Sequence, residues 1–249
     1  MISWVLLTHN RSEIVSEAFG HCLRNAGAPW KEIIWVDNGS DFDHYARLQA
    51  LFRPYVHTAV SYHHNRGVAA GYNAGMGLAT GDYIVVTGCD MKMPANWLAL
   101  FIEYVTKIPQ TAVACIYSKP LSKSTERIRG PAQIVNGLPL VPAFPIERRI
   151  FKRELLRDIG YFWETFGLYS YDDIAWAHTA ERVAMEKGLI NYVIPNVVAE
   201  HLGTEGIHKN VNEDPAYHAM KQREATDPAK RAELERLRGL GWPAYRAFL

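Results

Sequence analysis

The sequence predicts an α/β protein with a mostly parallel central sheet flanked by helices, and two observations support this fold. Short apolar runs alternate with stretches of helical spacing along the first half of the chain, which is typical of a parallel sheet covered by helices. Asp37 directly follows one apolar run, and Asp90 lies shortly after another. Because open α/β sheets bind ligands at the carboxyl ends of their strands, we expect a site there.

Short apolar runs predict the strands of this half. They are residues 2–7, 33–36, 57–62, 83–86 and 112–117. Apolar residues at helical spacing predict the helices between them, and Ser12 is expected to cap the first. These helices are residues 12–27, 45–52, 67–75 and 94–104. The right-handed crossover rule then makes this half Rossmann-like.

The helix expected after residue 66 carries glycines at every fourth position: Gly67, Gly71 and Gly75. This spacing places all of them on one face of the helix. Each glycine weakens the helix by about 1 kcal/mol. A face without side chains lets the helix lie close to a sheet or to a bound ligand.

The second half of the chain is less regular. Residues 119–145 contain repeated prolines and predict long loops with a hairpin, and loops of this length are often functional. Residues 153–159 predict a short helix before Gly160. Asp172 and Asp173 open a helix that ends at Gly188, and residues 191–194 and 197–199 form extended segments leading to His201.

The composition becomes polar and charged after about Asn212. We therefore expect a main domain at residues 1–213 and a helical C-terminal tail at residues 214–249. Asp227 and Pro228 predict the start of a tail helix, and Gly239 predicts its end. The last apolar side chains leave three alternatives: packing on this chain, on a twin subunit in a homodimer, or on a membrane surface. They are Trp242, Tyr245, Phe248 and Leu249.

Composition excludes several classes of protein. The formal net charge is +1, which gives no electrostatic case for bulk nucleic-acid binding. Cys22, Cys89 and Cys115 form no CxxC pair, which argues against a disulfide framework and a structural zinc site. No basic region precedes the N-terminal apolar run, and no apolar run approaches the roughly 20 residues of a membrane span. We expect a cytoplasmic, soluble protein.

Several segments in a fixed order carry a further signal. They are VLLTHNR, IIWVDNGSDFD, NRGVAAGYNAG followed by GDYIVVTGCD, RRIFKRELLRDIGYFWETFGLYSYDDIAWA, and VIPNVVAEHLG. Over roughly residues 2–203 the chain resembles the family 2 glycosyltransferases, which have the GT-A fold. One such motif alone is weak, whereas their common order implies both the fold and the activity.

The resemblance implies a nucleotide site at the ends of the first strands, with Asp37 accepting a hydrogen bond from a pyrimidine N–H. A carboxylate is a suitable acceptor for that planar edge. As alternatives, Asp37 forms only an Asx-turn with Ser40, and Arg66 is only a surface residue. The residues implied for base, ribose and phosphate contacts are Thr8, Asn10, Arg11, Asp37, Asn65 and Arg66.

The resemblance also implies a divalent metal, Mn²⁺ or Mg²⁺, held by Asp90 and His201. The family usually has Asp-x-Asp where this chain has Gly88-Cys89-Asp90, so the first carboxylate is missing. Mg²⁺ takes only one or two protein carboxylates beside phosphates and waters, so Asp90 can suffice; imidazole suits Mn²⁺ better. For Lys92 there are two hypotheses. In one, its positive charge supplements that of the metal on the diphosphate; in the other, it is only a surface lysine.

Asp172 and Asp173 match the acidic pair of the family, and the resemblance implies that Asp173 is the general base. It takes the proton of an acceptor hydroxyl that attacks the anomeric carbon with inversion. Adjacent acids at a helix start also cap the helix and complement its dipole. Further residues are expected to border sugar and acceptor, although aromatic side chains there can equally belong to the core. They are Asp172, Trp163, Tyr171 and Arg149.

We therefore expect an inverting glycosyltransferase of carbohydrate biosynthesis that uses a nucleotide-diphosphate sugar, most simply a UDP-sugar. The acceptor is left open among a glycan, a lipid-linked intermediate, a protein and a modified nucleic acid. One alternative is a sugar nucleotidyltransferase, which the segment THNRSE after the first strand disfavours. The other is a non-catalytic nucleotide- or sugar-binding relic, suggested by the altered metal motif.

Overall fold

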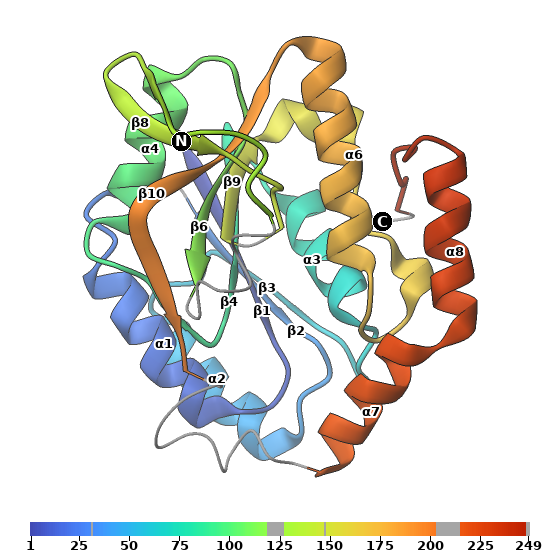
Figure 1. The fold of residues 1–249 in the computed structure, drawn as a ribbon. Coiled ribbons are helices and arrows are strands. Elements are labelled where there is room, and N and C mark those ends of the chain that lie inside the picture. The colour runs from blue at the N-terminus through green and yellow to red at the C-terminus, as the bar shows by residue number, and fades with distance from the viewer. Residues whose placement is uncertain (31, 119–126, 147, 203–214, 248–249) are drawn as a thin grey trace.

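The structure is a computed structural model that describes residues 1–30, 32–118, 127–146, 148–202 and 215–247 (Figure 1). Its described strands form a ten-stranded mixed sheet in the order β3-β2-β1-β4-β9-β6-β10-β8-β7, with β5 paired to β10. The bounds are β1 Ile2–Thr8, β2 Glu32–Asp37, β3 Thr58–Ser61, β4 Tyr83–Gly88, β5 Met91–Lys92, β6 Thr111–Ser118, β7 Gln133–Val135, β8 Leu138–Pro142, β9 Arg148–Lys152 and β10 Ile190–His201.

Helices cover both faces of this sheet (Figure 1). They are α1 Ser12–Arg24, α2 Phe42–Phe52, α3 Val68–Leu78, α4 Trp97–Lys107, α5 Leu156–Ile159, α6 Asp172–Lys187, α7 Pro215–Thr226 and α8 Pro228–Gly239. Strands β3, β2, β1 and β4 are parallel, as are β6 and β10. The α/β fold with a parallel, Rossmann-like first half is therefore confirmed.

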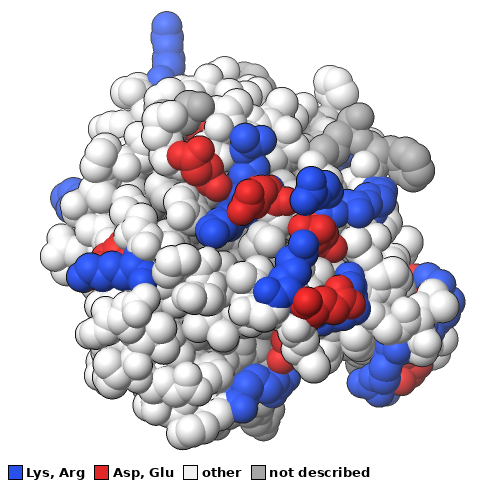
Figure 2. All heavy atoms as spheres, turned by 90° about the horizontal axis from the view of Figure 1, so that it is seen from above, with Lys and Arg blue, Asp and Glu red and all other residues white. Residues whose placement is uncertain are grey.

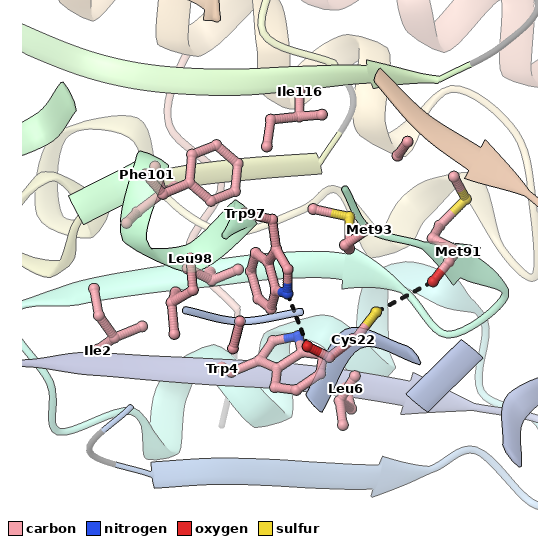
Figure 3. Close-up of a cluster of buried hydrophobic side chains, with 14 of the residues drawn as sticks. Ile2, Trp4, Leu6, Cys22, Met91, Met93, Trp97, Leu98, Phe101 and Ile116 are labelled. Atoms are coloured by element: carbon pink, nitrogen blue, oxygen red, sulfur yellow. Dashed lines mark hydrogen bonds between the residues drawn. The ribbon is translucent and has the colours of Figure 1, made fainter. Parts of the chain in front are cut away.

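The core consists of two main apolar layers, one on each side of the sheet. The layer beneath α1 and α4 is rich in aromatic side chains, with Trp4 and Trp97 rings 5.3 Å apart. Cys22 joins this layer: its carbonyl accepts a hydrogen bond from Trp97 Nε1 at 2.9 Å, and its thiol donates to the Met91 carbonyl at 3.2 Å (Figure 3). Cys22, Cys89 and Cys115 are free thiols, as expected.

The sequence analysis missed β9, which lies antiparallel between β4 and β6 in the middle of the sheet. Its sequence RRIFK contains only two apolar residues, Ile150 and Phe151, which are fully buried. Charged residues lie on both sides of this apolar pair, so the strand is too short to be found in a search for apolar runs. It places Arg149 at the carboxyl end of β4.

Two further details correct or sharpen the expectations. Ser12 is the first residue of α1 and not its cap; Arg11 holds the cap position in the left-handed conformation, with φ 58°. The predicted hairpin exists as β7 and β8, joined by Asn136 and Gly137, both with positive φ. An Asn-Gly pair of this kind suits a two-residue hairpin turn. Residues 119–126 of the expected loop lie outside the described residues.

The glycine face of α3 lies against the sheet. A Cβ atom at Gly71 would stand 2.2 Å from Leu7 Cδ1, and one at Gly75 would stand 2.3 Å from Val5 Cγ1. Of the two expected reasons for a bare helix face, the structure therefore supports close packing on β1. The glycines set how deeply α3 sits beside the carboxyl ends of the strands.

Gly75→Ala is expected to destabilise the protein by about 1–3 kcal/mol, because the added methyl overpacks a buried contact. Gly77 lies in the same helix but is exposed, so Gly77→Ala is a matched control that should be neutral or stabilising by up to about 1 kcal/mol. Thermal unfolding of both variants measures the difference. Equal melting temperatures for the two variants would contradict the close packing of α3.

The C-terminal segment packs on the same chain. The Trp242 ring stacks on His178 of α6 at 4.1 Å, and Tyr245 contacts Trp163 at 4.9 Å. Asp227 caps α8 by accepting a hydrogen bond from Ala229 N at 2.8 Å, and Gly239 ends it, both as expected. Phe248 and Leu249 lie outside the described residues, as does the expected domain boundary.

Charged side chains on the face opposite the carboxyl ends of the parallel strands carry both signs, and they lie interspersed (Figure 2). Ion pairs at this end of α6 join Arg182 to Glu186 at 2.6 Å and Lys187 to Asp158 at 3.3 Å. Among the described residues, no helix combines the length and apolar character needed to cross a bilayer.

Candidate active site

A cleft of about 260 Å³ opens at the carboxyl end of β4, between α3, β9 and the first turn of α6. Asp172, Asp173 and Arg149, all named from the sequence, line it together. The remaining lining residues are Val68, Tyr72, Val86, Thr87, Gly88, Arg127, Ile146, Arg148, Phe162, Tyr169 and Ser170. The cleft thus joins the altered metal motif to the acidic pair.

Asp172 and Asp173 occupy the first turn of α6, and both line the cleft. Tyr171 holds the cap position of α6, so neither acid is its N-cap residue, whereas both lie in the first turn, where acids complement the helix dipole. Burial, and then the charge of Asp173, raise the pKa of Asp172 to about 7. Burial also raises the pKa of Asp173, and Arg149 opposes that rise more than any other group. Burial of the two neighbouring carboxylates therefore disfavours their simultaneous ionisation.

Arg149 is a buried cation in the same cleft as these acids, with only 5% of its surface exposed. Its Nη2 donates a hydrogen bond to the Ile146 carbonyl at 2.6 Å. Its guanidinium also lies over the rings of Phe162 and Trp176, at 5.1 and 4.8 Å. Burial lowers the pKa of Arg149, and the charge of Asp173 opposes this change.

Asp90 and His201, the predicted metal pair, lie side by side. Antiparallel pairing of β5 with β10 brings their backbones together, and His201 Nε2 is 3.4 Å from Asp90 Oδ2. Arg11 Nη1 is 3.6 Å from the same oxygen. Two ligands at right angles on one metal ion, each about 2.1 Å from it, are about 3 Å apart. The pair therefore fits a shared divalent ion, although the described residues contain no group of three acidic, histidine or cysteine ligands.

Gly88 stands where the family usually has an acid, and the local packing explains this. A Cβ atom at Gly88 would stand 2.9 Å from Asp90 Oδ1 and 3.2 Å from Met91 Cγ. The Asp90 side chain thus occupies space that a side chain at position 88 would need. Burial raises the pKa of the neighbouring Cys89 to about 12, so this thiol stays protonated and is a poor metal ligand.

Asp37 ends β2 in a buried hydrogen-bond network. Its Oδ1 accepts from Thr8 Oγ1 at 3.1 Å and from Ser40 Oγ at 2.6 Å, and its Oδ2 accepts from Ser40 N at 3.0 Å. The Asx-turn alternative is therefore present. A carboxylate has about four acceptor positions, so three bonds still leave capacity for a ligand N–H.

Asn38 connects the other nucleotide-side residues, although the sequence analysis gave it no role. Its side chain donates to Asn65 Oδ1 at 2.9 Å and accepts from Arg66 N at 3.0 Å. The Arg66 guanidinium lies 4.7 Å from the Tyr62 ring centre. Asn10 has positive φ, as Arg11 does, and its backbone N–H donates to Ser40 Oγ at 2.7 Å. The predicted nucleotide residues thus gather at the ends of β1 and β2.

Apart from Arg149, Asp172 and Asp173, none of the predicted site residues is in the lining of the cleft, and three of them have partners elsewhere. Lys92 pairs with Glu17 at 2.6 Å, which agrees with its alternative as a surface residue. Trp163 belongs to an apolar cluster with Phe166. The Tyr171 hydroxyl donates to the Ala225 carbonyl at 2.9 Å and so attaches α7 to the start of α6. Trp163 and Tyr171 therefore make the contacts of packing residues.

Two cleft residues, Tyr72 and Arg127, escaped the sequence analysis. Tyr72 comes from α3, and its hydroxyl donates to the Thr87 carbonyl at 3.1 Å. Arg127 comes from the region before β7, and only the tertiary fold brings it to the cleft. Arg148 and Ser170 line the cleft next to two residues that the sequence analysis named, Arg149 and Tyr171.

Comparisons with known proteins match this chain to one family. The sequence profile of Glycosyl transferase family 2 matches residues 3–174. Among curated proteins, the poly-beta-1,6-N-acetyl-D-glucosamine synthase of Staphylococcus epidermidis is 22% identical over 188 residues, which cover 70% of this chain and 45% of that protein. This chain therefore spans less than half the length of that relative.

Two solved structures show a similar fold. The mannosyltransferase PcManGT from Pyrobaculum calidifontis, in complex with GDP-Man and Mn²⁺, has a TM-score of 0.61 at 20% identity, with 88% of this chain and 62% of that chain covered. TarS 1-349 of S. aureus, in complex with UDP-GlcNAc, has a TM-score of 0.62 at 18% identity, with 84% of this chain and 60% of that chain covered. At these identities the likeness concerns the fold.

Proposed function

The chain belongs to Glycosyl transferase family 2 and has the GT-A fold, and from this premise we propose that it transfers a sugar from a UDP-sugar to an acceptor hydroxyl with inversion. The observation that carries the proposal is the position of Asp173. It lies in the first turn of α6, in the same cleft as Gly88 of the altered metal motif. The catalytic unit is assigned to residues 1–213, with residues 214–249 as a helical tail.

In this mechanism Asp173 is the general base. A hydroxyl of the acceptor enters the cleft, and Asp173 takes its proton as the oxygen attacks the anomeric carbon. Such proton transfer contributes about 10²- to 10⁴-fold to a rate. The sugar–phosphate bond breaks on the opposite side, so one displacement inverts the anomeric centre and the diphosphate leaves with the nucleotide.

The nucleotide occupies the ends of β1 and β2 in this proposal. The remaining acceptor capacity of Asp37 suits the N–H of a uracil ring, and Asn38 holds the adjoining Asn65 in place. The similar TarS structure contains UDP-GlcNAc, which makes UDP the first nucleotide to test. GDP follows, because the similar PcManGT structure contains GDP-Man.

A divalent ion, Mn²⁺ or Mg²⁺, would be held by Asp90 and His201, which the fit of their 3.4 Å separation supports. Such an ion, when bound, neutralises negative charge on the departing diphosphate. Arg11 lies 3.6 Å from Asp90 and adds a fixed positive charge beside it. Manganese in the PcManGT structure makes Mn²⁺ the first ion to test.

A thermal-shift panel of nucleotides and nucleotide sugars, with and without Mn²⁺, tests the donor side. We expect a uridine ligand with Mn²⁺ to raise the melting temperature most, and incubation with that nucleotide sugar to release free UDP through slow hydrolysis. A larger shift from guanosine ligands would contradict the UDP assignment. Binding without any turnover, with acceptors of several classes, would instead indicate the non-catalytic relic.

Asp37→Asn should weaken uridine nucleotides selectively. A hydrogen bond to a charged acceptor contributes about 1.5–3 kcal/mol, which corresponds to about ten- to a hundredfold in affinity. Asparagine keeps one carbonyl oxygen for the Thr8 and Ser40 hydroxyls, whereas alanine would remove the acceptor of both hydroxyl protons. Calorimetric titration with UDP, CDP and GDP measures the effect. Equal losses for all three nucleotides would mean that Asp37 does not recognise the base.

A further inference from the structure

The segment that leads into the acidic pair forms one wall of the cleft and carries an exposed aromatic residue. This wall segment, residues 167–171, contains no helix or strand, and Asp172 and Asp173 follow it in α6. Tyr169, in the middle of the wall segment, lines the cleft and keeps 37% of its surface exposed. An accessible aromatic ring offers an apolar face to a ligand. Because neither helix nor strand fixes the wall segment, the position of Tyr169 depends on contacts with other elements.

The start of α3 provides one of these contacts. The backbone N–H of Val68 donates a hydrogen bond to the Leu168 carbonyl at 3.2 Å. The two backbones approach closely here, because a Cβ atom at Gly67 would stand 2.3 Å from the Gly167 carbonyl oxygen. The acceptor of the Val68 N–H thus belongs to the wall segment. Exchange of this amide hydrogen with solvent therefore reports how firmly the wall segment is held.

A second set of contacts joins the wall segment to the tail, whose helices lie beside α6 (Figure 1). Lys230 of α8 donates a hydrogen bond from Nζ to the Tyr169 carbonyl at 3.3 Å, and it forms an ion pair with Glu224 of α7. The Tyr171 hydroxyl donates to the Ala225 carbonyl at the end of α7 at 2.9 Å. The backbone of the aromatic cleft residue is therefore attached directly to a tail helix.

Other contacts suffice to attach the tail to the domain. Leu237 of α8 is fully buried in an apolar cluster with Trp163 and Phe166, and the Tyr161 N–H donates to the Tyr245 carbonyl at 2.9 Å. The ion pair of Lys230 is mostly buried, with 11% of the lysine side chain exposed. Replacing such a pair by apolar residues is often neutral for stability. The place where Lys230 holds the wall segment therefore explains it better than attachment of the tail does.

We propose that Lys230 is a positioning residue through which the tail holds Tyr169 against the sugar ring of the bound donor. In the proposed function the donor sugar joins the diphosphate to the reacting carbon, so it lies in the cleft between Gly88 and the acidic pair. The inference rests on the proposed function for the identity of this ligand. The attachment of the wall segment to α8 does not depend on it.

The first arm of the test measures backbone amide exchange by NMR and needs no ligand. A hydrogen bond from a charged donor corresponds to about ten- to a hundredfold in an equilibrium. The Val68 amide should therefore exchange at least about tenfold faster in Lys230→Met than in the wild type, while amides of the buried strand β6 keep their rates. Lys230→Arg retains a charged donor and should restore slow exchange. An unchanged Val68 rate in Lys230→Met would overturn the proposal.

The second arm uses calorimetric titration with UDP and UDP-GlcNAc as the probe ligands. A tyrosine that carries binding energy at an interface corresponds to at least about fivefold in affinity. Tyr169→Ala should weaken UDP-GlcNAc by at least this factor and leave UDP affinity within about twofold of the wild type. Lys230→Met should show the same selective loss. Equal losses for the two ligands, or no loss, would contradict a contact between Tyr169 and the sugar.

The double variant separates positioning from a merely structural role. If Lys230 acts through Tyr169, Lys230→Met should add little to the loss that Tyr169→Ala already causes, because residues that act together are not additive. Additive losses in UDP-GlcNAc affinity would refute this role. If Lys230→Met does not fold, Tyr171→Phe removes the other bond between the wall segment and the tail. It should then accelerate exchange of the Val68 amide, and an unchanged rate would overturn the proposal.

Arg236→Met is the matched control for charge. Arg236 lies in the same helix as Lys230 and pairs with Glu233 at 2.6 Å, but 54% of its side chain is exposed. This variant should leave Val68 exchange and both affinities unchanged, and an effect equal to that of Lys230→Met would show a general loss of helix charge. If the wild type binds neither UDP nor UDP-GlcNAc, the proposed function fails. Amide exchange then still decides whether Lys230 holds the wall segment.

Discussion

Asp173→Asn is expected to lower turnover by about 10²- to 10⁴-fold while UDP affinity stays within about twofold of the wild type. Asparagine has nearly the same shape as aspartate but cannot accept a proton at neutral pH. The loss should therefore appear in kcat, with little change in the donor KM. Steady-state kinetics of sugar transfer, together with calorimetric titration of UDP, measure the two quantities separately.

The same substitution alters the charge balance of the cleft, and this affects stability. Without the charge of Asp173, the pKa of Asp172 should fall, because the repulsion that helps to raise it is gone. Asp172 can then ionise and balance the buried Arg149. We therefore expect Asp173→Asn to fold, with a modest loss of stability. An unchanged kcat would remove Asp173 as the base.

Asp158→Asn is the matched control for this substitution. Asp158 pairs with Lys187 at 3.3 Å, at the opposite end of α6 from the acidic pair. Exposed ion pairs of this kind contribute about 0–1 kcal/mol. Turnover and UDP binding should both stay at the wild-type level. A comparable fall in turnover for both variants would point to a general effect of lost negative charge and not to proton transfer by Asp173.

The parallel half of the sheet followed from sequence because its information is local. Strands β1, β2 and β4 are mainly apolar runs buried on both faces, and the glycine spacing of α3 marks a helix that lies directly on β1. Strand β9 did not follow. Only Ile150 and Phe151 form its apolar part, and its place between β4 and β6 depends on contacts between distant segments, which no local pattern encodes.

The candidate site also has residues that the sequence predicted and features that it did not. Asp37, Asp90 and Asp173 follow strand ends or open a helix, and these positions are visible in the sequence. The pairing of Asp90 with His201 was implied by the family resemblance, whereas the antiparallel pairing of β5 with β10 beside them was not predicted. The burial of the Arg149 guanidinium in the same cleft as the acidic pair was not visible in the sequence, because it depends on the tertiary fold and on strand β9, which was not predicted. Lys92 has a polar partner, Glu17, that sequence spacing does not reveal.

Asp90→Ala should abolish the dependence of UDP binding on Mn²⁺. Changes around a metal site commonly alter metal affinity or activity by about 10- to 100-fold, so the wild type should bind UDP at least about tenfold more tightly with Mn²⁺ than with a chelator. In the variant the two affinities should be equal. The substitution also removes the anion that lies beside Arg11 and His201. Because an anion repels the diphosphate, the variant should bind UDP with a chelator at least as well as the wild type does.

Glu103→Ala, which removes an exposed carboxylate paired with Lys107, should retain the full Mn²⁺ effect. If wild-type UDP affinity is the same with Mn²⁺ and with a chelator, Asp90 and His201 hold no metal during binding, and Arg11 must neutralise the diphosphate instead.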